Sequence, residues 1–136
     1  MPTIHAGAVL VGARALLIRG PSGAGKSRLA LALVEAGLAG RLCFTRLVTD
    51  DRAEVETAGG RLLVRAPAVL AGLLEIRGLG IRRLPFEPLA LAGWVVDLAA
   101  DAPRLPSPAE SVTAVEGVTL PRFAFPACAD PLPVLL

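Results

Sequence analysis

Residues 20–27 read GPSGAGKS, a glycine-rich stretch that ends in a lysine and a serine. The spacing from Gly20 through Gly25 to Lys26 and Ser27 matches the Walker A pattern of a phosphate-binding loop, or P-loop. Glycines let backbone N–H groups turn inward around an anion, the lysine reaches the β- and γ-phosphates, and the serine hydroxyl binds Mg²⁺. Lys26 is also the only lysine among the 14 basic residues. The residues predicted to bind a nucleotide are Gly20, Pro21, Ser22, Gly23, Ala24, Gly25, Lys26 and Ser27.

Two adjacent carboxylates, Asp50 and Asp51, follow the apolar stretch RLVT. A P-loop enzyme needs a carboxylate at the end of a neighbouring strand to hold the metal ion or its waters. The other carboxylate is then free to accept a proton from the incoming nucleophile. The residues leave open which Asp has which role, although a metal ligand at a strand end is more often the first. Because like charges repel, the pKa of one of them should be raised when no metal is bound.

The stretch LLEIRGLGI carries Glu75 and Arg77 just before two glycines. An acid and a base in an apolar stretch are costly if they are buried without partners. They form either a structural ion pair or a functional set, with Glu75 as a second metal ligand and Arg77 as a phosphate contact. The residue types alone favour neither interpretation.

The P-loop is predicted to lie between a buried strand and a helix. Residues 7–11 and 13–18 are apolar runs that predict a hairpin, and the second run leads directly into the loop. From residue 26 onward apolar residues recur at helical spacing, and Gly37 is predicted to end that helix.

The rest of the chain predicts an α/β fold, with helices flanking a mixed sheet that contains hairpins. The predicted elements are a strand at 43–48, a hairpin around 59–60, a helix beginning at Pro67, a glycine-rich turn at 77–81, a buried strand at 91–100 and one strand within 111–120. From residue 101 the chain is rich in proline, and outside that last strand it is predicted to be mostly irregular.

Composition excludes several classes of protein. The length of 136 residues predicts one domain. A net charge of +2, with basic and acidic residues mixed along the chain, argues against nucleic-acid binding. The apolar runs fall short of the roughly 18–20 residues that span a bilayer, and no signal peptide is recognisable, so we expect no membrane association. Cys43 and Cys128 lie far apart and predict reduced thiols in a cytoplasmic protein.

Four stretches, IHAGAVLV, GPSGAGKS, RLVTDD and LLEIRGLGI, resemble the catalytic domain of the HPr kinase/phosphorylase family and occur in the same order. The resemblance covers roughly residues 3–105. It implies a P-loop domain of the phosphoenolpyruvate carboxykinase-like type. It also implies an ATP- and Mg²⁺-dependent kinase that phosphorylates a serine of the phosphocarrier protein HPr. Longer family members form hexamers, so a homo-oligomer is possible.

The resemblance also implies roles for individual residues. His5 matches the active-site histidine of the family, Lys26 the catalytic lysine and Ser27 a metal-binding serine. The implied catalytic residues are His5, Lys26, Asp50, Asp51 and Arg104, and the implied metal ligands are Ser27, Asp50 and Glu75. Arg77 stays a candidate phosphate contact on its residue type alone.

The sequence departs from the family in ways that bear on function. We expect residues 1–136 to form a single catalytic domain, of which 106–136 are a proline-rich, partly irregular tail. Near Pro121 and Arg122 the chain lacks the glycine and the second basic residue that the family uses for dephosphorylation, which argues against phosphorylase activity. The alternatives are a P-loop kinase of small molecules and a nucleotide-binding sensor without turnover.

Overall fold

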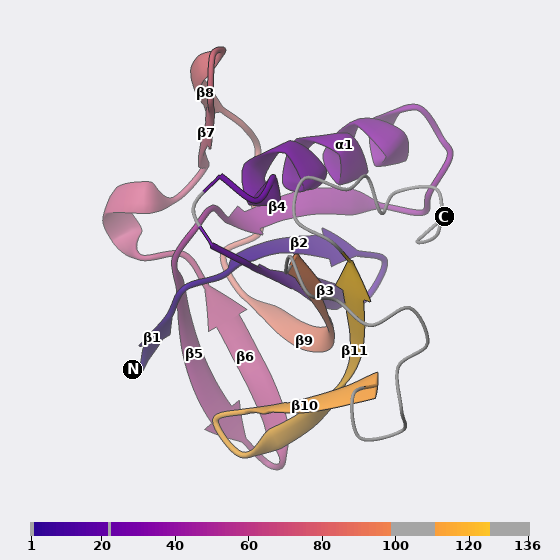
Figure 1. Cartoon of the computed structure of the whole chain (residues 1–136), viewed down its shortest axis with the longest axis vertical. Coiled ribbons are helices and arrows are strands. Elements are labelled where there is room, and N and C mark those ends of the chain that lie inside the picture. The colour runs from indigo at the N-terminus through magenta and orange to yellow at the C-terminus, as the bar shows by residue number, and fades with distance from the viewer. Residues whose placement is uncertain (1, 22, 99–110, 126–136) are drawn as a thin grey trace.

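The computed structural model describes residues 2–21, 23–98 and 111–125 (Figure 1). Its helices are α1 (Lys26–Leu38) and the short 3₁₀ turn η1 (Ala68–Leu70). Its strands are β1 (Thr3–Ile4), β2 (Gly7–Val11), β3 (Arg14–Arg19), β4 (Thr45–Thr49), β5 (Ala53–Ala58), β6 (Arg61–Arg65), β7 (Leu73–Ile76), β8 (Gly80–Arg83), β9 (Ala90–Leu98), β10 (Val112–Val115) and β11 (Val118–Phe125).

Nine of the strands form one mixed sheet, which confirms the predicted α/β class. Its order is β1-β5-β6-β9-β3-β2-β4, and β11 pairs with both β9 and β10. Strands β3 and β11 each run parallel to β9, whereas β2 is antiparallel to both β3 and β4. Strands β7 and β8 form a separate hairpin that projects from the body (Figure 1). The carboxyl ends of β3, β9 and β11 therefore lie side by side at the same end of the sheet.

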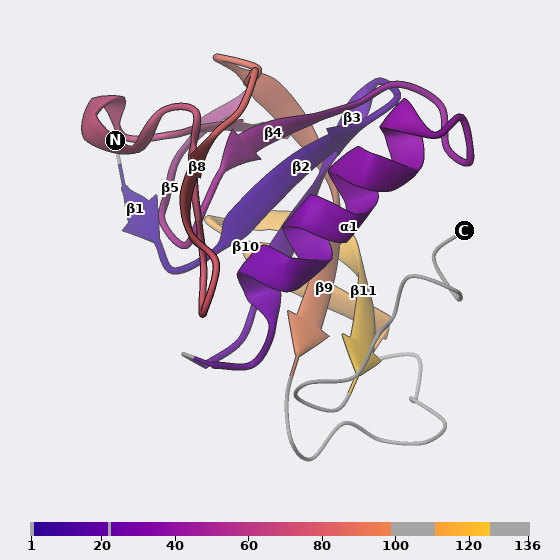
Figure 2. The ribbon, with the colours of Figure 1, turned by 90° about the horizontal axis from the view of Figure 1, so that it is seen from above.

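The central strands are buried on both faces. In β3, Leu16 and Ile18 belong to the core that α1 covers, while Ala15 and Leu17 belong to a second core on the opposite face. Side chains alternate between the two faces of a strand, so a continuous apolar run fills both cores. Figure 2 shows α1 lying along one face of the sheet, above β2 and β3. This packing fixes the first turn of α1 over the edge where β3 ends.

Helix α1 begins at Lys26 as predicted, but Gly37 does not end it. The helix continues to Leu38, and Gly37 lies inside its last turn. A Cβ on Gly37 would lie 1.9 Å from Oγ1 and 2.7 Å from Cβ of Thr45 on β4. The Thr45 hydroxyl also donates a hydrogen bond to the Val34 carbonyl at 3.3 Å. Gly37 is therefore required for the close approach of α1 to β4.

We expect the Gly37→Ala substitution to destabilise the protein by about 1–3 kcal/mol, the usual cost of overpacking. Helix propensity alone would predict the opposite, because alanine is favoured over glycine by up to ~1 kcal/mol inside a helix. Chemical denaturation measures the effect. Gly7→Ala is the matched control, because its Cβ would meet atoms no closer than 3.5 Å. A Gly37→Ala variant as stable as wild type would contradict the packing account.

The helix predicted from Pro67 is wrong. Only the single turn η1 forms, and the following residues are extended and pair with β8. Ala71 already has an extended backbone, and Gly72 has φ 76°, with Phe86 and the Leu84 carbonyl within 3.1 Å of where its Cβ would lie. A helix cannot continue through these two residues, so LLEI becomes β7. Within the described residues α1 is the only α-helix, and none is long and apolar enough to span a membrane.

The proline-rich region contains more regular structure than predicted. Residues 112–125 form a β-hairpin rather than one strand, turning at Glu116 and Gly117, which both have positive φ. The second strand, β11, contains Pro121 and continues to Phe125 alongside β9. For residues 112–125, the predictions of a single strand and of an irregular tail are therefore wrong. Residues 99–110 and 126–136, including Cys128, lie outside the described residues, while Cys43 is an exposed free thiol.

Candidate functional site

The P-loop connects the end of β3 to the start of α1, where the carboxyl ends of the parallel strands meet. Gly23 and Gly25 have φ values of 83° and 99°, a left-handed conformation that side chains disfavour. The Ala24 N–H donates to the Pro21 carbonyl at 3.1 Å, which closes the loop on itself. The local sequence thus dictates a tight turn directly before a helix.

The N-terminus of α1 is open to an anion. Gly25 occupies the cap position, no side chain caps the helix, and its first turn has no acidic residue. The first N–H groups of a helix have no partner within the helix and carry the positive end of its dipole. A phosphate group at this position would satisfy both features.

Lys26 is held within this loop. Its side chain is only 8% exposed, although lysine is rarely buried. Its ammonium donates to the Gly20 carbonyl at 2.7 Å and lies 3.3 Å from a carboxylate oxygen of Asp51. The ammonium group of Lys26 is therefore held at the start of the P-loop, next to the carboxylate of Asp51.

Asp50 is fixed between the P-loop and the β7–β8 hairpin. The Ser27 hydroxyl donates to one of its oxygens at 2.7 Å, and the backbone N–H of Glu75 donates to the other at 3.0 Å. These contacts join residues 23 and 25 positions apart in the chain. They bring together the predicted metal-binding serine, the first Asp and the Glu75 region.

The pKa of Asp50 is raised above its ordinary value of 3.8. Burial is the largest cause, the hydrogen bonds from Ser27 and Glu75 oppose it, and the charges of Asp51 and Glu75 add to it. A buried carboxylate close to two other carboxylates is stabilised by a proton or by a bound cation. The direction agrees with the predicted effect of the adjacent Asp pair, and burial contributes more than the repulsion does.

The raised pKa predicts that ionised Asp50 destabilises the ligand-free fold. The folded protein binds this proton more tightly than the unfolded chain, so its contribution to stability falls as pH rises from 3.8 through the folded-state pKa. We expect Asp50→Asn to be more stable than wild type at pH 7, because the amide carries no charge to desolvate. The difference should shrink below pH 3.8, where Asp50 is protonated in both states. Denaturant unfolding on both sides of this window measures the effect, and a variant less stable than wild type at neutral pH would contradict it.

Asp51 differs from its neighbour in conformation and exposure. Its φ is 66°, in the left-handed region, and its side chain is 61% exposed. Asp is among the few residues that tolerate this backbone. The turn directs Asp50 into the protein and Asp51 toward solvent beside Lys26, so the two adjacent carboxylates face different surroundings.

These groups line one open cavity of about 900 Å³, a volume within the range of small-molecule sites. Arg77 lies beside the loop, with a guanidinium nitrogen 3.6 Å from a Cβ position on Gly23. The lining residues are Gly23, Gly25, Lys26, Ser27, Arg28, Leu29, Ala32, Asp50, Asp51, Glu75, Ile76, Arg77, Gly78 and Gly80. Glu75 and Arg77 thus share the site with the P-loop.

The oxygen atoms that line the cavity are suitable ligands for Mg²⁺. The cavity offers the Ser27 hydroxyl and carboxylate oxygens, and Mg²⁺ prefers few protein oxygens together with waters and phosphates. Among the described residues no group of three or more His, Cys, Asp and Glu side chains forms a preformed metal cage. The Ser27 hydroxyl and the carboxylates of the cavity fit Mg²⁺ bound together with a phosphate.

Some predicted residues lie at the margin of the site or outside the described residues. His5 is exposed and does not line the cavity. Its neighbours pair on both sides of the Asp turn, Ile4 with Ala53 and Ala8 with Thr49. The bend at His5 therefore runs beside Asp50 and Asp51. Arg104 and Ser22 lie outside the described residues.

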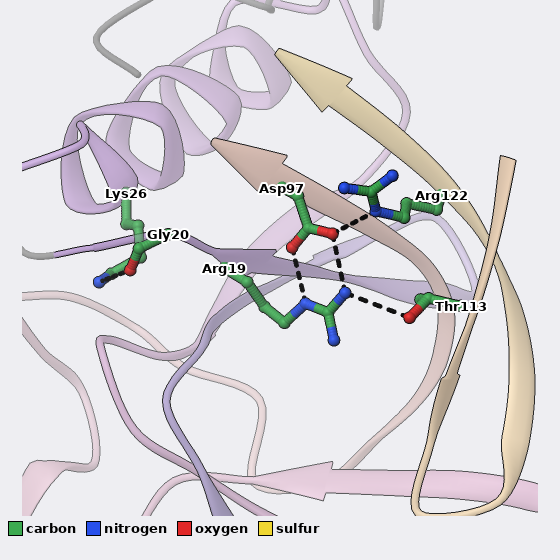
Figure 3. A network of polar contacts seen from close by, with 6 residues as sticks. All are labelled: Arg19, Gly20, Lys26, Asp97, Thr113 and Arg122. Carbon is green, nitrogen blue, oxygen red and sulfur yellow. Dashed lines mark hydrogen bonds and ion pairs between the residues drawn. The ribbon is translucent and has the colours of Figure 1, made fainter. Parts of the chain in front are cut away.

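Two features escaped the sequence interpretation. Arg28 lines the cavity, and its position directly after the P-loop motif was the available signal. Asp97, near the end of β9, forms ion pairs with Arg19 at the end of β3 and with Arg122 within β11 (Figure 3). The signal there was a charge at the end of two apolar runs, but its partner depends on the strand register.

Comparison with known proteins identifies relatives of this chain. The family description "HPr Serine kinase C-terminal domain" matches residues 2–84. An HPr kinase/phosphorylase of Clostridium beijerinckii is 42% identical over 78 residues, 57% of this chain and 24% of the relative. One from an Exiguobacterium species is 44% identical over 82 residues, 60% of this chain and 24% of the relative. The chain thus spans about a quarter of the length of these curated relatives.

The fold is similar to that of a solved structure. The Hpr(Ser) kinase/phosphatase from Coxiella burnetii has a TM-score of 0.80 and 25% sequence identity to this chain. The match covers 99% of this chain and 86% of that one.

Proposed function

The chain belongs to the HPr serine kinase C-terminal domain family, and from this premise we propose that it is an ATP- and Mg²⁺-dependent protein-serine kinase. Its proposed substrate is the phosphocarrier protein HPr or a related protein. The observation that carries the proposal is the contact of Ser27 with Asp50 beside Lys26 and Asp51, at an open helix N-terminus. That set supplies an anion site, a cation, a metal-ligating hydroxyl and two carboxylates within one cavity.

The residues of the P-loop would bind and orient the triphosphate. Backbone N–H groups of the loop and of the first turn of α1 donate to phosphate oxygens, and Lys26 exchanges the Gly20 carbonyl for the β- and γ-phosphates. Ser27, Asp50 and Glu75 would hold Mg²⁺, which neutralises charge on the transferring phosphoryl group when bound. Arg77 adds a further positive group beside the phosphates, and Arg104 is proposed to assist.

The acidic pair would handle the proton. The serine oxygen of the acceptor forms a bond to the γ-phosphorus, the bond from that phosphorus to the β–γ bridging oxygen breaks, and ADP leaves. The serine proton passes to a carboxylate of the pair Asp50 and Asp51. His5, whose bend runs beside this pair, is proposed to support the same step.

Further properties follow as proposals from family membership. We propose a P-loop fold of the phosphoenolpyruvate carboxykinase-like type, in which residues 1–136 form one catalytic domain. We also propose a cytoplasmic location, action on protein without nucleic-acid or membrane partners, and a homo-oligomer as a possible assembly. The sequence VTLPRFAFPA supports a kinase without the reverse phosphorylase activity, because it lacks the basic, glycine-containing segment.

Nucleotide binding and acceptor choice test the proposal together. Calorimetry with ATP should show binding that strengthens when Mg²⁺ is added. The same protein should then be incubated with ATP, Mg²⁺ and either an HPr-type phosphocarrier or a panel of nucleoside monophosphates and small metabolites. We expect transfer to the protein acceptor alone. Transfer to a small molecule, or tight binding without turnover on any acceptor, would overturn the proposed substrate or the proposed activity respectively.

A further inference from the structure

A charged cluster connects the strands at the edge of the sheet, outside the cavity (Figure 3). Asp97 of β9 accepts two hydrogen bonds from Arg19 of β3, from Nε at 2.7 Å and from Nη2 at 2.8 Å. Nε of Arg122 on β11 donates to the same carboxylate. Arg19 Nη2 also donates to the Thr113 hydroxyl on β10 at 3.3 Å. One carboxylate therefore connects the three parallel strands, and through Arg19 it also reaches β10.

The cluster lies where the chain enters the P-loop. Arg19 is the last residue of β3, and it is the direct cross-strand partner of Asp97. The next residues, Gly20 and Leu98, also approach closely, because a Cβ built on Gly20 would lie 2.7 Å from the Leu98 carbonyl oxygen. The bidentate pair thus fixes the relative position of two chain segments just where they leave the sheet.

The position of the end of β3 sets the position of the phosphate-binding loop. The Gly20 carbonyl, one residue after Arg19, accepts the hydrogen bond from Lys26 at 2.7 Å. A shift at the end of β3 would displace that carbonyl and the loop that follows it. Displacements near 1 Å in an active site can cost a factor of about 100 in rate.

We propose that Asp97 is a positioning residue for the phosphate-binding loop, acting through Arg19 and Gly20 on Lys26 without touching substrate. The inference rests on the proposed function, since it concerns the same nucleotide site. It assigns a role to three charged residues, Arg19, Asp97 and Arg122, that the proposed chemistry leaves unused.

The cluster is better suited to fixing the positions of the strand ends than to stabilising the fold. Burial would raise the pKa of Asp97, but hydrogen bonds from Arg19 and Arg122 outweigh it and hold the pKa below 3.8. The carboxylate therefore stays ionised at neutral pH. Partly buried ion pairs add little net stability compared with apolar residues, whereas a bidentate arginine–carboxylate pair is geometrically specific. Lysine in place of Arg19 would keep the charge and lose the fork.

The test compares nucleotide affinity with stability in folded protein. Calorimetry with Mg²⁺ and the ATP analogue AMP-PNP is done on wild type, Asp97→Asn and Arg19→Lys, with circular dichroism and thermal unfolding on the same samples. We expect the affinity for AMP-PNP to fall by about tenfold or more in Asp97→Asn, the loss expected when a charge-assisted hydrogen bond to the phosphates is weakened, and by less in Arg19→Lys. Arg19→Lys keeps the test decisive if Asp97→Asn does not fold. The matched control is Glu54→Gln, which removes an ion pair to Arg65 of 2.9 Å between β5 and β6, away from the cavity.

The outcomes are distinct. Weaker binding by both cluster variants in their folded state, with Glu54→Gln within about twofold of wild type, supports the positioning role. Wild-type affinity in a folded Asp97→Asn or Arg19→Lys protein overturns it, even if the melting temperature falls, because the cluster would then be structural only. Absence of AMP-PNP binding by wild type itself overturns the proposed function on which the inference rests.

Discussion

Replacing Lys26 by Ala should lower the rate of phosphoryl transfer by about 100- to 1,000-fold. The 8% exposed ammonium is held against the backbone of the P-loop, at 2.7 Å from the Gly20 carbonyl. Charge on the transferring phosphoryl group is greatest in the transition state, and losing a single preorganised donor costs about 10²–10³ in rate. A steady-state assay with ATP, Mg²⁺ and the phosphocarrier measures the effect.

Lys26→Arg gives the more specific result. Arginine keeps the positive charge but needs space for a planar fork, and the buried position beside Asp51 offers little. We therefore expect most of the activity to be lost in this variant as well. Arg61→Ala, at the exposed first residue of β6, is the control for loss of one positive charge. Activity within about tenfold of wild type in Lys26→Ala would refute the assigned role.

Asn substitutions in the acidic pair should be nearly as severe. Asp50→Asn and Asp51→Asn should each lower transfer by about 100-fold or more, because general-base catalysis and metal binding each contribute on this scale. Both changes preserve side-chain shape, so the fold and the Ser27 contact should survive. The acceptor of the serine proton is the residue whose Asn variant loses transfer while retaining Mg²⁺-dependent ATP affinity. Glu56→Gln, an exposed carboxylate on β5, is the control.

The rate of phosphoryl transfer and the ATP affinity, measured by calorimetry for both variants, distinguish the metal ligand from the proton acceptor. Loss of both transfer and Mg²⁺-dependent binding identifies the carboxylate on the metal side. If both variants transferred at the wild-type rate, the assignment of the pair would be wrong.

Local patterns allowed much of the fold and of the P-loop to be predicted. The two hairpins at residues 7–19 and 53–65 and the start of α1 depend on turn residues and on spacing within a few positions. The meeting of Ser27 with Asp50 followed from the requirement of a P-loop for a carboxylate at a strand end. Chemistry that is local or obligatory can be derived from residue types.

Features set by long-range contacts were not predictable in this way. LLEI is an apolar run that suits a buried helix or a strand, and the turn at Gly72 together with pairing to Gly80–Arg83 decides the outcome. The role of Gly37 depends on Thr45 across the helix–sheet interface. The Arg19–Asp97 pair joins residues 78 positions apart, and it exists only because parallel pairing places them opposite each other.

The most direct test of the central claim is the intact mass of an HPr-type phosphocarrier after incubation with this protein, ATP and Mg²⁺. Lys26→Ala and an acceptor with its target serine replaced by alanine are run in parallel. We predict addition of one phosphoryl group, located on that serine by fragmentation, and no addition in either control. An unchanged acceptor mass, with an enzyme sample that binds ATP in calorimetry, would contradict the claim that this chain is an HPr-type serine kinase.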